Sequence, residues 1–296
     1  MGTGYLGGAK VINAVVEALQ YSFMRNALLA GVLVSIACGV IGTYVVIKRI
    51  VFISGGIAHA AYGGIGLGYF FNFNPVFGAI LFSLVSAFGM GMAQRKTRQR
   101  ADTIIGVMWA IGMAIGIIFI DKTQGYKADL MSYLFGSILT VPTTDLIIML
   151  VLNLIIVTLV WLFYKEFQAI SFDETFAAIE NVPVNTLYLI LLAMIALTVV
   201  MLMRVVGLIM VIALLTIPSA ISGLFVRDIK KMMVLSSVLG VCFTTVGLFL
   251  SYFWNLTSGA TIILVSGVAY LLALGVRSLM HLSAKGTMES DAINAA

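Results

Sequence analysis

The sequence predicts an all-α polytopic membrane protein with eight or nine transmembrane helices. Hydrophobic residues make up 61% of the 296 residues and charged residues only 10%, whereas about 25% of the residues in an ordinary soluble domain are charged. Apolar runs of the length needed to cross a bilayer follow one another from about residue 27 to residue 280. No stretch between them is long enough for a separate soluble domain. We therefore expect residues 1–296 to form a single transmembrane domain.

Nine apolar segments are candidates for the spanning helices. Short helices near residues 10–24 and 129–140 are ambiguous, so the count stays at eight or nine. The start of the chain, MGTGYLGGAK, lacks the pattern of a secretory signal, and we expect the first span to direct insertion. An N-terminal segment of residues 1–26 precedes a membrane core of residues 27–280, and a tail of residues 281–296 follows. The candidate spans cover residues 27–47, 51–71, 76–94, 103–120, 144–164, 187–203, 206–226, 232–253 and 260–280.

The net charge of +5 comes from basic residues at the ends of the spans rather than along one face, so we expect no nucleic-acid partner. Cytoplasmic loops of membrane proteins are enriched in Lys and Arg. If the first span runs from outside to inside, 12 of the 17 basic residues lie on the cytoplasmic side. We therefore expect a multi-pass protein of the cytoplasmic (inner) membrane whose C-terminal tail, with His281, is cytoplasmic. The 12 residues are Lys48, Arg49, Arg95, Lys96, Arg98, Arg100, Lys165, Arg227, Lys230, Lys231, Arg277 and Lys285.

Two segments between the spans predict short helices. Residues 129–140, DLMSYLFGSILT, are too few to cross the bilayer, which favours a short or re-entrant helix on the outer side. On the cytoplasmic side, Asp173 and Glu174 favour the start of a helix through Ala178. Asn181 is suited to the left-handed conformation that ends a helix, and Pro183 prevents its continuation. This second segment, residues 165–185, is a candidate contact for a partner.

His59 lies near the middle of the second span, IVFISGGIAHAAYGGIGLGYFF, which contains no other ionisable group except phenols. At 1.5 Å per helical residue, the imidazole lies about 14 Å deep in a hydrocarbon layer about 30 Å thick. An ionisable side chain at that depth is costly unless it faces protein or a wet cavity, so a functional role is the first interpretation. The alternative is a packing histidine that is hydrogen-bonded to a neighbouring helix.

Two glycines and a tyrosine share the helix face of His59. Gly55 and Gly63 stand four residues before and after the histidine, where they would leave space for a passing ion. Tyr62 could bind the imidazole ring or a hydrated ion, although an aromatic residue at this position also fits simple packing.

The seventh span, VGLIMVIALLTIPSAISGLFV, predicts a broken helix and a second element of a pathway. Pro218 removes a backbone donor, and Thr216, Ser219 and Ser222 supply hydroxyl groups nearby. Directly after it, a short amphipathic helix could dock on a partner at the cytoplasmic face. The alternative is a basic anchor that fixes topology. The residues concerned are Gly223, Leu224, Phe225, Arg227, Asp228, Lys230 and Lys231.

The sequence does not carry the usual motifs of an enzyme. It has no GxxxxGK[ST] phosphate-binding loop, no HExxH and no GxSxG, so we expect a non-enzymatic protein and any ATP-driven process to use a partner subunit. Cys38 and Cys242 lie in apolar segments far from CxxC spacing, and we interpret both as small apolar residues rather than metal ligands.

Six motifs follow one another along the chain: FMRNALLAGVLVSIACGVIGTYVVIKR, GGIAHAAYGGIGLG, TIIGVMWAIGMAIGIIF with LMSYLFGSIL, SFDETFAAIENVPV, VGLIMVIALLTIPSAISGLF and SGATIILVSGVAYLL. In this order they resemble the membrane permeases of zinc, manganese and iron importers of the ATP-binding cassette (ABC) class, the ABC-3 family. The resemblance covers residues 22–277 and implies a type II importer-like fold. It also implies two ABC ATPase subunits, an extracytoplasmic metal-binding protein and a second permease protomer, as a homodimer or a pair of permeases, with residues 217–231 as the coupling element. The transported metal ion would be substrate, and no cofactor is bound permanently.

One departure from the family bears on the cargo. Similar zinc and manganese permeases carry an aspartate four residues before the histidine, and the two would form an intramembrane metal site. Here that position is Gly55, so another ligand is needed from Ser54, Tyr62, a cysteine or the second protomer. Two alternatives stay open: an ABC permease for a metal chelate or cobalamin-like cargo, and a secondary ion-coupled transporter. The latter usually needs several intramembrane carboxylates, whereas the spans contain only Asp145, at the end of one.

Overall fold

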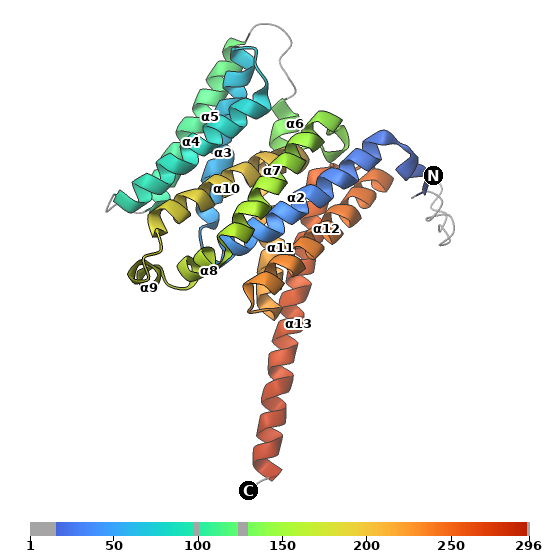
Figure 1. The fold of residues 1–296 in the computed structure, drawn as a ribbon. Coiled ribbons are helices and arrows are strands. Elements are labelled where there is room, and N and C mark those ends of the chain that lie inside the picture. Colours follow the sequence, from blue (N-terminus) through green and yellow to red (C-terminus); the bar gives the residue numbers. More distant parts are fainter. Residues whose placement is uncertain (1–15, 97–100, 124–129, 295–296) are drawn as a thin grey trace.

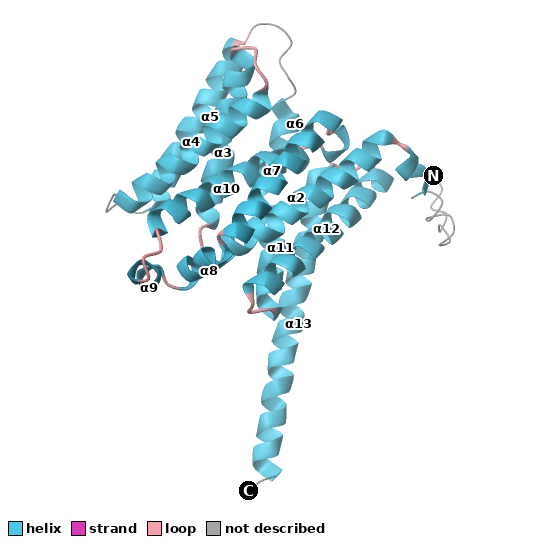
Figure 2. Ribbon diagram, in the orientation of Figure 1, coloured by secondary structure: helices cyan, strands magenta, loops and turns pink. Residues whose placement is uncertain are grey.

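The computed structural model describes residues 16–96, 101–123 and 130–294, and the regular elements in these ranges are all helices (Figure 1). Nine helices of the described ranges are long and apolar enough to cross a membrane, which is the higher of the two predicted counts. Where the chain is described, the loops that join successive helices are short (Figure 2). The nine are α2 (Ser22–Ile47), α3 (Val51–Phe70), α4 (Pro75–Lys96), α5 (Ala101–Lys122), α7 (Thr143–Leu162), α10 (Val184–Val205), α11 (Val211–Phe225), α12 (Ile229–Trp254) and α13 (Ser258–Asn294).

The helices form two groups that α10 joins. In the first, α3 packs between α4 and α5; in the second, α2 packs against α7, α11 and α12. Helix α10 contacts α2, α3 and α4, and most of its side chains are buried. The core of the bundle therefore lies around α2, α3 and α10, and the predicted histidine helix is inside it rather than at its lipid-facing edge.

Helix α3 approaches its neighbours closely because of its glycines. A methyl group on Gly64 would lie 2.0 Å from the carbonyl oxygen of Gly78 on α4, and one on Gly66 would lie 2.4 Å from the carbonyl oxygen of Gly116 on α5. Small residues allow membrane helices to pack without a hydrophobic driving force between them. Packing thus accounts for most of the glycines in the second span.

The chain is irregular at the end of the bundle that contains α6 (Leu130–Phe135) and the 3-10 helices η1 (Ile138–Thr140) and η2 (Leu208–Met210). The predicted segment 129–140 is thus two short helices, and Asp129 is outside the described residues. Gly136 and Gly207 have φ of +70° and +81°, and a methyl group on Gly207 would lie 2.3 Å from the backbone nitrogen of Gly136. Two glycines allow these backbones to touch in conformations that other residues rarely adopt.

The break predicted at Pro218 is wrong in its position. Helix α11 runs through Pro218 from Val211 to Phe225, and the irregular backbone lies earlier, at Gly207 and η2. Proline removes one hydrogen bond from a helix, but neighbouring groups in a membrane protein often compensate. A glycine with positive φ redirects the chain more sharply, and here it separates α10 from η2.

Two short helices lie at the opposite end of the bundle from α6 (Figure 1): α8 (Tyr164–Phe172) and α9 (Glu174–Ile179). The predicted capping of α9 is confirmed, since the Asp173 carboxylate accepts hydrogen bonds from the backbone N–H groups of Thr175 and Phe176 at 2.8 and 3.1 Å. These bonds hold the pKa of Asp173 below its usual value, and the bond from Phe176 has the larger effect. Asn181 has φ of 59°, as predicted for the residue that stops the helix.

We refer to this end as the basic end, because Lys48, Arg95, Lys165, Arg227 and Lys230 lie at the helix termini there. The C-terminal end of α13 extends beyond the bundle in the same direction (Figure 1). The candidate span ends at Met280, and the segment predicted as a tail continues the same helix as far as Asn294.

Gly207→Ala should destabilise the protein. An alanine at positive φ costs about 1–2 kcal/mol, and the added methyl group must also displace the backbone of Gly136. Thermal unfolding in detergent should show a lower midpoint. The matched control is Gly106→Ala on α5, where nothing lies within 4 Å of the added methyl group and the midpoint should stay equal or rise. A Gly207→Ala midpoint at or above that of the unsubstituted protein would contradict the expectation.

Candidate functional site

His59 stacks on Trp109 of the neighbouring helix α5. The two ring centroids are 3.9 Å apart and the ring planes differ by 7°. The indole N–H of Trp109 in turn donates to the sulfur of Met113 at 3.3 Å. The imidazole ring therefore lies parallel to the indole ring of Trp109, and the indole N–H already has a hydrogen-bond acceptor.

The Nδ1 atom of His59 is buried and has no hydrogen-bond partner among the described residues. The alternative of a packing histidine requires a hydrogen bond to a neighbouring helix, and no such bond accounts for this atom. A buried polar group without a partner is costly in a membrane. The ring is partly exposed, so the site combines a fixed imidazole plane with an unsatisfied nitrogen.

The space predicted beside the two glycines is filled in this structure. A methyl group on Gly55 would lie 2.5 Å from Cδ1 of Ile212 on α11, and one on Gly63 would lie 2.8 Å from Cε1 of Phe82 on α4. Both glycines therefore serve as close packing contacts here. Their role along a pathway remains a prediction.

The two additional ligand candidates are engaged in other contacts. The Ser54 hydroxyl is fully buried and donates to the carbonyl oxygen of Val51 at 2.7 Å. Tyr62 is buried against Gly116, where its Cδ1 would lie 2.7 Å from an added methyl group. Among the residues whose positions are described, no three His, Cys, Asp or Glu side chains gather as a metal site. Within these ranges, His59 is therefore not part of a complete cluster of strong ligands.

Helix α11 meets the histidine helix through Ile212, and Thr216 lies one turn further along the same helix face. The hydroxyls of Thr216 and Ser222 donate to the carbonyl oxygens of Ile212 and Pro218, at 2.7 and 2.9 Å. Ser219 Oγ is buried without a partner and faces α2, since it would lie 2.8 Å from a methyl group on Gly42. The predicted hydroxyls are therefore divided between the α3 and α2 sides of α11.

The short amphipathic helix predicted after this span is absent from the described chain at that position. Gly223, Leu224 and Phe225 are the last residues of α11, and Asp228 caps α12 by accepting the backbone N–H of Lys231 at 2.9 Å. Only residues 226–228 connect α11 to α12, and this connection is too short for a separate helix. A cavity of about 400 Å³ at this turn is lined by residues 223–227 and by Arg277 and Met280 of α13.

Helices α8 and α9 expose an apolar surface at the basic end. Phe172, Phe176 and Ile179 are 71%, 60% and 72% exposed. The three residues lie outside the spanning helices, and we call them the α9 apolar face. Large exposed apolar side chains close together indicate a contact surface.

Asp145, the one carboxylate inside a predicted span, is paired with a cation at the other end of the bundle. Its Oδ2 atom lies 2.5 Å from the Arg204 guanidinium, which lies 5.3 Å from the Tyr133 ring centroid. The Tyr69 hydroxyl donates to the Tyr133 hydroxyl at 3.3 Å. These contacts join α7, α10, α6 and α3. Because Asp145 is paired with Arg204 in this structural network, it is a weak candidate for the carboxylate of a secondary ion-coupled transporter.

Nine helices of the described chain that are long and apolar enough to cross a membrane, one of which holds an unpaired imidazole, define a polytopic membrane protein whose site fits a transport permease. The chain belongs to the ABC 3 transport family, whose model matches residues 20–277. The predicted resemblance is thereby confirmed. The protein is a multi-pass membrane permease subunit of an ABC transporter rather than an enzyme.

Three comparisons support this assignment. An uncharacterised membrane protein of Synechocystis is 62% identical over 90% of this chain and 95% of its own length. The manganese transport system membrane protein MntC of Listeria monocytogenes is 36% identical over 84% of this chain and 88% of its own. The structure is similar to PsaBC from Streptococcus pneumoniae in complex with Fab, with a TM-score of 0.81 and 31% identity over 88% of this chain and 95% of that chain.

Sequence reasoning missed Trp109 as a site residue. The residue stood within one of the six motifs, TIIGVMWAIGMAIGIIF, but nothing in its spacing from His59 indicates that the two rings touch. A tryptophan in the middle of an apolar span was the signal available.

Asp145→Asn should destabilise the protein by about 3 kcal/mol, the low end for a broken buried ion pair, because it leaves the partly buried Arg204 guanidinium without a carboxylate. Chemical unfolding in detergent would measure the loss. The control is Asp145→Asn combined with Arg204→Gln, which should recover part of the stability since no uncompensated charge remains. If the double variant loses as much stability as Asp145→Asn and Arg204→Gln lose separately when summed, the ion pair does not act as a unit.

Proposed function

We propose that this permease takes up divalent transition metal ions, with manganese favoured over zinc and iron. The unpaired Nδ1 of His59 in the middle of a spanning helix carries the proposal. Imidazole nitrogen is a common ligand of these metals. The name of the Listeria relative supports manganese.

Desolvation makes transfer of a bare dication through hydrocarbon prohibitive. The pathway must therefore open to one side at a time and offer temporary ligands. Conduction also requires that each ligand site be weak enough to release the ion. One imidazole without the family's carboxylate meets that condition, and further ligands would come from Ser54, Tyr62 or a second protomer.

The driving force comes from other chains. We propose that two ABC ATPase subunits bind the basic end, that a second copy of this chain completes the pathway, and that an extracytoplasmic metal-binding protein delivers the ion. This arrangement places the permease in the cytoplasmic membrane with its C-terminus inside, as the charge distribution predicts.

Two surfaces of the basic end are available for the ATPases. One is the segment of residues 217–231, which comprises the end of α11, the connection and the start of α12. The family resemblance assigned this segment to coupling, and its Phe225 is exposed. The other is the α9 apolar face, whose three side chains are more exposed than Phe225 and lie outside the spanning helices. We propose that the α9 apolar face is the main docking surface and that the segment of residues 217–231 contributes a smaller contact.

His59→Ala should abolish metal uptake while membrane insertion and ATPase binding persist, since the substitution removes the ligand and leaves the bundle intact. Elemental analysis of cells with and without the permease would identify the metal. His281→Ala is the matched control, and it should leave uptake unchanged. Normal uptake by His59→Ala would remove the histidine from the mechanism, and unchanged manganese, zinc and iron contents would support the chelate alternative.

Gly55→Asp should restore the family's carboxylate, but only together with Ile212→Ala, because Ile212 occupies the space that any side chain at residue 55 would need. Added ligand charge tightens metal binding, so we expect Mn²⁺ to bind at least about tenfold more tightly. Gly55→Ala with Ile212→Ala is the control without a carboxylate. Equal Mn²⁺ affinity of the two double variants, measured by titration of the purified permease, would show that residue 55 is remote from the path of the ion.

A further inference from the structure

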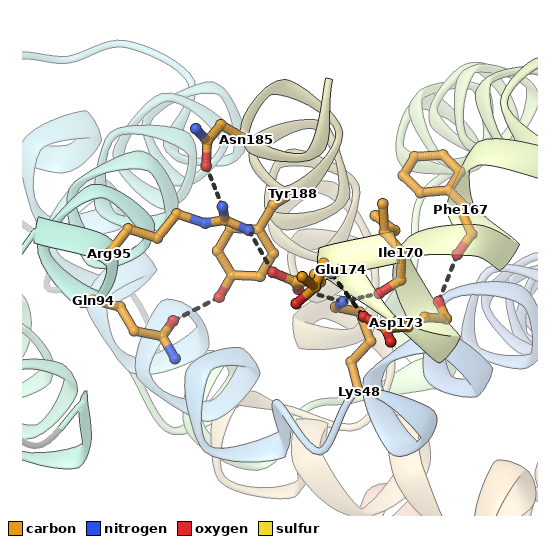
Figure 3. A network of polar contacts seen from close by, with 11 residues as sticks. Lys48, Gln94, Arg95, Phe167, Ile170, Asp173, Glu174, Asn185 and Tyr188 are labelled. Carbon is orange, nitrogen blue, oxygen red and sulfur yellow. Dashed lines mark hydrogen bonds and ion pairs between the residues drawn. The ribbon is translucent and has the colours of Figure 1, made fainter. Parts of the chain in front are cut away.

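Glu174, the first residue of α9, bridges two cations that come from different spanning helices (Figure 3). Its Oε1 atom lies 2.7 Å from the ammonium of Lys48, and its Oε2 atom lies 3.3 Å from the guanidinium of Arg95. Lys48 is the C-cap residue of α2, and Arg95 lies in the last turn of α4. One carboxylate thus ties α9 to both helix groups of the bundle.

The contact with Lys48 is the stronger of the two. The Lys48 side chain is only 7% exposed, and its ammonium also donates to the carbonyl oxygen of Ile170 on α8 at 2.7 Å. A buried ammonium without a partner is strongly destabilising. Lys48 therefore fixes the position of α8 and α9 relative to the end of α2.

The contact with Arg95 extends the network to α10. The Arg95 guanidinium donates to Asn185 Oδ1 and lies 4.3 Å from the ring centroid of Tyr188. The Tyr188 hydroxyl donates to Gln94 Oε1 at 2.6 Å. An isolated surface pair contributes little, but here stacking on Tyr188 and the hydrogen bond to Asn185 hold the guanidinium in place.

Helix α9 has little else that attaches it to the spanning helices. Its backbone packs beside α8 and the start of α10, and Ala177 is its one buried residue. A cavity of about 360 Å³ between Lys48, Arg95, Glu174 and Tyr188 leaves room for the side chains to move. A displacement of α9 therefore reaches α2 and α4 through the Glu174 carboxylate.

We propose that Glu174 is a positioning residue that transmits the movement of the docked ATPases from α9 to α2 and α4. Helix α4 packs on α3, which carries His59, and α2 packs on α11. The carboxylate thus leads from the α9 apolar face to both predicted pathway helices. This inference rests on the proposed docking of ATPases on that face.

The test uses the complete transporter in liposomes, with Mn²⁺ uptake and ATP hydrolysis measured together. Glu174→Gln should lower the Mn²⁺ transported per ATP at least about fivefold, the lower range of typical coupling between sites. ATPase binding and basal hydrolysis should persist, which a merely structural defect would not allow. Glu180→Gln removes the same charge at the exposed end of the same helix and should leave the ratio unchanged.

A double variant tests whether the contact acts as a unit. Lys48→Met combined with Glu174→Gln should lower the ratio no further than Glu174→Gln alone, since no unpaired ammonium remains. If Glu174→Gln fails to assemble, Arg95→Gln carries the test, because it breaks the tie to α4 and leaves the Lys48 pair intact. It should lower the ratio in the same direction.

The outcomes separate this inference from the proposed cargo. Stimulation of ATP hydrolysis by the metal-binding protein does not depend on which metal is moved, and Glu174→Gln should reduce it as well. A wild-type complex that is stimulated but moves no Mn²⁺, Zn²⁺ or Fe²⁺ overturns the proposed cargo only. Wild-type stimulation and transport ratios in Glu174→Gln, or losses that multiply in the double variant, overturn the role of Glu174.

Discussion

The absence of water from the bilayer core is the constraint on which this structure depends. Each buried polar group has to find its partner inside the protein. Most hydroxyls in the spans meet the requirement locally: those of Ser35, Thr43 and Thr198 donate to the carbonyl oxygen one turn earlier, at 2.6 to 2.8 Å. Among the described residues, His59 Nδ1 is one of five buried side-chain polar atoms without a partner, and a group that only contributed packing would be easier to bury as an apolar residue.

The same constraint separates the charged groups from the helix contacts in the middle of the bundle. Ion pairs occur at the two ends, with Asp145 and Arg204 at one and Glu174 with its two cations at the other. In the middle, backbones meet at small residues, as at Gly112 of α5, where an added methyl group would lie 2.6 Å from the Cα of Ala60 on α3. Interactions at the ends hold specific partners together, whereas smooth glycine contacts permit small displacements of one helix along another. This division suits a permease that is driven from one end.

Local sequence signals predicted local structure well. The apolar runs predicted the spans, and the Asp173 cap and left-handed Asn181 followed from single residues whose chemistry acts within one turn. The break in the seventh span was misplaced because proline is a strong local signal, while Gly207 depends on contact with Gly136, 71 positions earlier in the chain. The stacking of Trp109 on His59 and the bridge from Glu174 to Lys48 and Arg95 were missed for the same reason, since they join residues whose proximity only the tertiary packing determines.

Gly55 stands where the resemblance to zinc and manganese permeases predicts an aspartate, and its surroundings involve a second helix. The position that a side chain at residue 55 would occupy is filled by Ile212 of α11, so the carboxylate cannot return unless α11 changes as well. The remaining imidazole lies against the face of an indole, and an aromatic face attracts cations with about 0.5–2 kcal/mol. That attraction is far weaker than the pairing of a dication with a carboxylate. A site built from an imidazole and an indole would therefore hold a metal ion more briefly, which favours release over retention.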